Sequence, residues 1–179
     1  MKYLDKIQIN RKLADCLDCI GMNVDVSARV SLAQDYFREG YNCSQAVVLA
    51  FQDILGADRE LLERMSIGFG GGLGRMREVC GTVSAMAFVA GSLEPAEDED
   101  IRQRKAGVYT VVQALAQRFR EENGSIICRD LMGLRAGAKQ DPVPEARTAE
   151  YYKARPCVEL VGCSARIIAE YLNQYYSTK

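Results

Sequence analysis

The sequence predicts an all-α fold, a single-domain helical bundle of about six to eight helices with a glycine-rich loop before a central buried helix. Two observations support this. Apolar residues recur every three or four positions along most of the chain, whereas strand-like alternation is hard to find. Capping residues such as Asn42 and helix-ending glycines such as Gly56 bound the periodic segments. Both observations indicate helices joined by short loops.

The periodic segments divide the chain into an N-terminal arm and one domain. Residues 1–24 are expected to form an amphipathic arm that ends near Gly21, and residues 25–179 a helical domain that contains the four candidate cysteines. Asp25 or Ser27 can cap the first helix of this domain. Within the chain, helices are predicted at residues 4–20, 27–39, 43–55, 59–65, 75–93, 101–122, 128–132 and 157–175.

Residues 68–74, GFGGGLG, form the glycine-rich loop. A helix cannot hold five glycines cheaply, because each costs about 0.8–1 kcal/mol relative to Ala. The loop lacks the GKS or GKT ending of a phosphate-binding loop and follows no clear strand, so a nucleotide motif is not satisfied. Its backbone amides could still hold an anion. The candidate cofactor-binding residues are Gly70, Gly71, Gly72, Gly74 and Arg75.

Composition excludes several classes of function. The 179 residues carry a net charge of −1, which favours neither nucleic acid nor an anionic membrane surface. The chain has no His, so it lacks the commonest general base and every mixed Cys/His metal site. Its start has no apolar signal segment, and no apolar run approaches the ~20 residues that span a bilayer. We therefore expect a cytoplasmic protein without membrane insertion.

Seven cysteines are the main chemical feature of the chain. In a reducing compartment they indicate thiols, metal ligands or redox centres rather than structural disulfides. Cys43, Cys128 and Cys157 fall at predicted helix starts, where unpaired amides and the helix dipole favour a thiolate. Arginines lie near Cys128, Cys157 and Cys80 in the sequence, which also favours lowered thiol pKa values. These arginines are Arg75, Arg77, Arg129 and Arg155.

The other cysteines have weaker signals. Cys80 is expected one turn inside the helix over residues 75–93, with Glu78 nearby as a candidate proton acceptor. Cys16 and Cys19 form a CxxC pair without the βαβ setting usual for a redox motif. Cys163 lies within an apolar helical stretch and is interpreted as a core residue.

The order of the short motifs resembles a known family. The segments YNCSQAVVLAF, GFGGGLGRMREVCGTVSAM, ICRDLMG and RPCVELV occur as expected for the C_GCAxxG_C_C family of redox-active proteins. The likeness covers about residues 29–172. It implies four signature cysteines, Cys43, Cys80, Cys128 and Cys157. Around the second of them the chain has Val79, Thr82 and Ala85 in place of Gly, Ala and Gly.

Three hypotheses for function follow. The first is a thiol-dependent oxidoreductase with an unknown redox partner, in which Cys43 pairs with Cys80 or Cys128 with Cys157. The second is a metal site in which the same four thiolates hold zinc or an iron–sulfur cluster. The third is a non-catalytic helical assembly module with buried cysteines. A homodimer is compatible with each hypothesis.

Overall fold

The computed structural model describes residues 23–93, 100–135, 137 and 141–177. Over these residues the chain is all-α, which confirms the predicted fold class, and its only β-pairing is an isolated bridge between Val79 and Ile127. The expected helix at 4–20 and the Cys16–Cys19 pair lie outside the described residues. The elements are α2 (Val26–Arg38), α3 (Cys43–Leu49), α4 (Gln52–Leu55), α5 (Arg59–Ser66), the short 3-10 turn η2 (Ile67–Phe69), α6 (Gly81–Leu93), α7 (Ile101–Asn123), α8 (Cys128–Leu131), α9 (Ala149–Lys153) and α10 (Cys157–Ser177).

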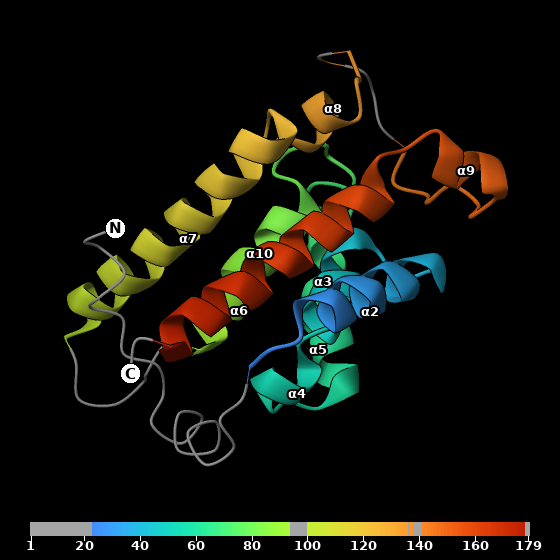
Figure 1. The fold of residues 1–179 in the computed structure, drawn as a ribbon. Coiled ribbons are helices and arrows are strands. Elements are labelled where there is room, and N and C mark those ends of the chain that lie inside the picture. Colours follow the sequence, from blue (N-terminus) through green and yellow to red (C-terminus); the bar gives the residue numbers. More distant parts are fainter. Residues whose placement is uncertain (1–22, 94–99, 136, 138–140, 178–179) are drawn as a thin grey trace.

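Three helices form the centre of the bundle. Every residue of α3 is buried, and α6 and α10 pack against it and against each other. The long helix α7 lies beside α6 and α10, while α2 covers the other side of α10 (Figure 1). The largest fully buried side chains are Phe37, Phe51, Phe119, Leu49, Met86, Ile167, Ile168 and Leu172. Burying them supplies the main driving force for this arrangement.

The helix boundaries follow the predicted caps. Asn42 forms a capping box at the start of α3, in which its side chain accepts from the backbone amides of Ser44 and Gln45. Asp25 caps α2 and Asp58 caps α5 in the same way. Each cap satisfies amides that a helix start leaves without intrahelical partners.

Two predicted helices differ from the structure. The segment 43–55 is divided into α3 and α4 by a break at Ala50 and Phe51. The Ala50 carbonyl accepts from Arg29 Nη1 at 2.6 Å. The segment 75–93 becomes helical only at Gly81, because Arg75 and Arg77 adopt left-handed backbone angles and Val79 joins the bridge to Ile127.

The helix starts that carry the candidate cysteines gather at one end of the bundle. The glycine-rich loop, α8 and the beginning of α10 meet there, and α6 starts from the same place (Figure 1). The helix α9, which the sequence reading did not anticipate, flanks this end. No helix within the described ranges is both long and apolar enough to cross a membrane.

Candidate functional site

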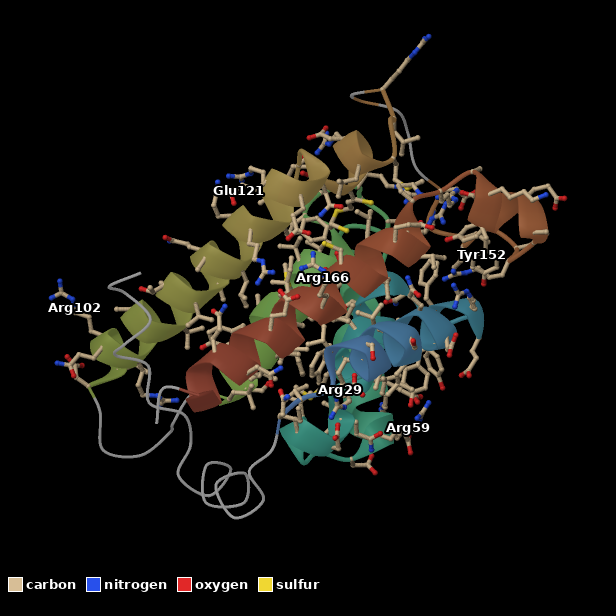
Figure 2. The ribbon with its side chains drawn as sticks, viewed as in Figure 1. Arg29, Arg59, Arg102, Glu121, Tyr152 and Arg166 are labelled. Atoms are coloured by element: carbon tan, nitrogen blue, oxygen red, sulfur yellow. The ribbon has the colours of Figure 1, made fainter. Side chains whose placement is uncertain are left out.

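Four cysteines from four separate segments line one pocket of about 250 Å³. Cys43, Cys128 and Cys157 are the first residues of α3, α8 and α10, as the sequence predicts. Cys80 immediately precedes α6. In Figure 2 the yellow sulfur atoms gather between α8 and the nearby ends of α6 and α10. Residues that lie 114 positions apart in the chain, Cys43 and Cys157, thus meet at one site.

The position of Cys80 corrects the sequence-based prediction. It was expected one turn inside a helix, but its carbonyl accepts the first helical hydrogen bond, from the Ser84 amide at 3.0 Å. Its Sγ lies 3.2 Å from Thr82 Oγ1, in a contact that either atom can donate. All four cysteines are therefore found at helix starts.

A short antiparallel pairing fixes Cys80 beside Cys128. The Cys80 amide donates to the Ile126 carbonyl at 2.8 Å, and the Cys128 amide donates to the Glu78 carbonyl at 2.7 Å. These bonds flank the bridge between Val79 and Ile127. The backbone itself, rather than side-chain packing alone, therefore holds the two cysteines on opposite sides of the pairing.

Two glycines allow the segments to approach closely. A Cβ added at Gly81 would lie 2.5 Å from Cys43 Sγ, and one at Gly72 would lie 2.6 Å from Cys128 Cβ. Neither distance is compatible with a real side chain. Gly72 also has a φ of +71°, which favours glycine. Gly72 of the loop and Gly81 at the start of α6 therefore let the cysteine-bearing segments approach one another.

Burial dominates the acidity of the thiols. It raises the pKa of Cys43 to about 11, that of Cys80 to about 12 and that of Cys157 to about 11. An ionised cysteine nearby would raise each of these pKa values further. In every pair among the four pocket cysteines, the negative charge of one thiolate would raise the pKa of at least one of the two thiols. The lowered pKa values expected for Cys43, Cys80 and Cys157 are therefore wrong. Loss of hydration outweighs the helix starts and arginines.

Four arginines, Arg75, Arg77, Arg147 and Arg155, also line the pocket. Arg77 is buried, with Nη1 3.9 Å from Cys128 Sγ. Arg155 and Arg147 act on the pKa of Cys157 in the lowering direction, although burial outweighs them. Cys157 is also the least buried of the four cysteines. Its Sγ lies 3.6 Å from Met132 Sδ, at the end of α8.

The remaining candidate residues occupy different places. Gly70, Gly71, Gly74 and Arg75 line the pocket, whereas Gly72 lies against Cys128. Glu78 forms an ion pair with Arg129 and is not part of the described pocket lining, so the geometry does not support it as a proton acceptor. Cys163 is half-buried: it packs against the core and also contacts the side chains of Asn123 and Glu122.

All five described cysteines are free thiols. Among the described residues, no group of three or more Cys, Asp or Glu side chains is arranged so that it could hold a metal ion. The four sulfurs therefore share one cavity without forming a closed set of ligands around a single ion. This arrangement leaves the thiols available to a molecule that enters the pocket.

A comparison with protein families now places the chain. Residues 41–171, which include all four pocket cysteines, match the family described as "Putative redox-active protein (C_GCAxxG_C_C)". The chain belongs to the C_GCAxxG_C_C family. No curated protein and no solved structure is significantly similar to it. In this member of the family, the spaced cysteines of the motif converge in three dimensions.

Sequence reasoning missed one wall of the pocket. Glu145, Arg147 and Tyr151 line it, together with Pro142 and Pro144. No element was predicted between residues 132 and 157. The Thr148 side chain, which accepts from the Tyr151 amide, was a readable signal for the start of α9. Nothing in the sequence spacing indicated that this segment folds over the cysteines.

Proposed function

We propose that the protein is a thiol-dependent redox protein that exchanges electrons with a small disulfide in the four-cysteine pocket. The convergence of Cys43, Cys80, Cys128 and Cys157 on one cavity is the observation that supports this proposal. Thiol exchange needs a second thiol near the first, and the pocket supplies several. A family described as redox-active is consistent with it.

Cys157 is the best candidate for the attacking thiol. It is the most accessible of the four, and Arg155 and Arg147 favour its thiolate. Among the cysteines, Cys80 and Cys128 act most strongly on the pKa of Cys157, so these two are the candidates for the resolving thiol. This choice develops the Cys128–Cys157 pairing of the sequence analysis rather than Cys43–Cys80.

The exchange balances in two steps. Cys157 loses its proton and attacks one sulfur of the disulfide, the S–S bond breaks, and the first thiol product leaves with a proton. The resolving cysteine then loses its proton and attacks Cys157 Sγ in the mixed disulfide, which releases the second thiol product. The protein gives up two electrons and two protons, and the small disulfide takes up both.

Mapping of the disulfide tests the proposal. Reduced protein with Cys16 and Cys19 replaced by serine is treated with 2-hydroxyethyl disulfide, alkylated and analysed by peptide mass spectrometry. We expect one intramolecular disulfide that joins Cys157 to Cys80 or Cys128. Cys157→Ser should slow oxidation by about 100-fold or more, since the attacking thiol is gone. Cys163→Ser, the matched control, should change the rate by less than about twofold.

Other outcomes separate the alternatives. A Cys43–Cys80 disulfide would keep the redox function but reassign its residues, and no cross-link at any pocket cysteine would contradict the proposal. Iron with inorganic sulfide, or zinc, in stoichiometric amounts in anaerobically purified protein would instead favour the four-cysteine metal hypothesis. Metal analysis of the same preparation therefore belongs to this experiment.

A further inference from the structure

The pocket has a positively charged wall that thiol exchange alone does not require. Its described lining includes Arg75, Arg77, Arg147 and Arg155, but only one carboxylate, Glu145. With Arg77 left out of the count, the three other guanidinium groups against one carboxylate leave a formal charge of +2.

One carboxylate serves two of these arginines. Glu145 accepts from Arg155 Nη2 through both of its oxygens at 2.6 Å, and its Oε1 lies 3.6 Å from Arg75 Nη2. The side chains of Arg155 and Arg75 are only 13% and 18% exposed, so water screens their charges poorly. The pair of arginines therefore keeps one net positive charge at the pocket.

Arg147 adds a further positive charge in a fixed position. Its guanidinium stacks over Phe37 and Tyr151, at 4.4 and 4.7 Å from the ring centroids, and Nη2 donates to the Tyr41 carbonyl at 3.1 Å. Its Nη1 is buried and has no hydrogen-bond acceptor. Among the described residues, no carboxylate pairs with it. A buried donor left without an acceptor is costly, and an anion in the pocket would satisfy it.

The cysteines do not neutralise this wall. Burial raises the pKa of Cys43, Cys80 and Cys157 to about 11 or 12, so these thiols are protonated and uncharged at neutral pH. Their sulfurs therefore offer no negative charge to the arginines in the reduced protein. A negatively charged molecule that enters the pocket would complement the arginines that these three thiols leave unbalanced.

We infer that the pocket binds a small organic dianion and that, if the proposed redox function holds, its substrate is a disulfide carrying carboxylate groups. The cavity of about 250 Å³ has the volume of roughly eight water molecules, enough for a compact organic molecule. Guanidinium groups bind carboxylates through paired charge-assisted hydrogen bonds. Arg147 and Arg155 would hold the carboxylates while the S–S bond faces Cys157.

Three small disulfides of different charge test the substrate class. The rate of protein oxidation is measured with dithiodipropionate, a dianion, with 2-hydroxyethyl disulfide, which is neutral, and with cystamine, a dication. We expect the dianion to react about tenfold faster than the neutral compound and the dication to react slowest. Because the attraction is electrostatic, added salt should reduce the advantage of the dianion.

Substitutions in the wall should change this preference. Arg147→Gln is expected to reduce the preference for dithiodipropionate by about tenfold, while Arg147→Lys keeps the charge and should retain part of it. Glu145→Gln should increase the preference, because it releases Arg155 and Arg75. Arg102→Gln is the matched control, since Arg102 is exposed at the far end of α7 (Figure 2) and should leave the preference unchanged.

A binding measurement separates this inference from the redox proposal. Suberate resembles dithiodipropionate but has two methylenes in place of its two sulfurs, so it cannot be reduced. We expect calorimetry to show that suberate binds wild-type protein and Arg102→Gln, and binds Arg147→Gln about tenfold more weakly. Circular dichroism checks that Arg147→Gln remains folded. If this variant does not fold, the disulfide preference of Glu145→Gln still tests the inference.

The two ideas then fail in different ways. Suberate binding without reaction of any disulfide would support the anion pocket and contradict the redox proposal. Equal reaction rates with all three disulfides, together with no suberate binding, would overturn the anion pocket and leave the redox proposal standing.

Discussion

Two groups of arginines lie beside cysteines in this molecule, and their charge balance differs. Between α7 and α10, Arg118 and Arg166 surround Cys163, and both form ion pairs with Glu122 and Glu170. Two positive charges thus meet two negative charges. At the four-cysteine pocket, Glu145 pairs with Arg155 and Arg75, and Arg147 adds a positive charge that no described carboxylate balances. The first group is neutral as a whole, and the second is not.

The difference separates a structural network from a candidate binding site. Partly exposed ion pairs that satisfy one another help to orient helices but leave nothing for a ligand to neutralise. An excess of poorly screened positive charge lowers the free energy of unfolding. Binding of an anionic ligand is a reason to retain such an excess. Cys163 also has no second described cysteine beside it, whereas each pocket cysteine has three neighbours lining the same cavity. The excess of positive charge and the group of four cysteines therefore lie at the same end of the bundle.

The largest effect is expected for the reaction of the buried pocket thiols with iodoacetamide as the pH changes. Only the thiolate reacts. Since burial holds the pKa of Cys43 and Cys157 at about 11, their alkylation should be slow at pH 7 and rise about tenfold per pH unit up to that value. Site-resolved mass spectrometry measures each rate. Full alkylation of Cys43 within minutes at pH 7 would contradict the assigned burial.

The same pKa values predict how stability depends on pH. A folded-state thiol pKa above the ordinary value means that the unfolded chain loses its proton first, so stability falls as pH rises. For Cys43 the loss should begin near pH 9 and continue to about pH 11, on the order of 2 kcal/mol for this thiol alone. Urea unfolding at several pH values measures it. Cys43→Ser should make the decline shallower.

Two glycines of α6, Gly81 and Gly91, allow a comparison of the pocket end of this helix with its opposite end. Gly81→Ala places a Cβ 2.5 Å from Cys43 Sγ and should destabilise the fold by about 1–3 kcal/mol. Gly91→Ala meets only Val108 Cγ1 at 3.9 Å and should be neutral or stabilising by up to ~1 kcal/mol. Thermal unfolding of both variants measures the difference. Equal effects would show that the close approach at Gly81 is not needed.

The smallest effect is expected for the ion pairs between α7 and α10 beside Cys163. Arg166→Gln breaks ion pairs with Glu122 and Glu170 on partly exposed side chains, so the unfolding free energy should change by less than about 1 kcal/mol. The rate of oxidation by 2-hydroxyethyl disulfide should not change. A large loss of that rate would place the network within the functional site rather than apart from it.

Local sequence signals predicted most of the helices. Asn42, Asp58 and Gly124 mark boundaries because capping depends on a few neighbouring residues and on one backbone conformation. The same signals place Cys43 at the start of α3. They failed at residues 75–80, where the bridge to Ile127, a contact distant in the chain, overrides the helical preference of an apolar segment.

The sequence by itself therefore determined the helical class, most of the helix starts and the cysteines of the family pattern. Only the tertiary structure decided that those cysteines face one cavity, because convergence depends on how α3, α6, α8 and α10 pack. It also reversed the expected thiol acidity, since hydration is lost through burial by distant residues. The wall formed by Arg147 and its neighbours was equally hidden, because no local pattern encodes which loop covers a pocket.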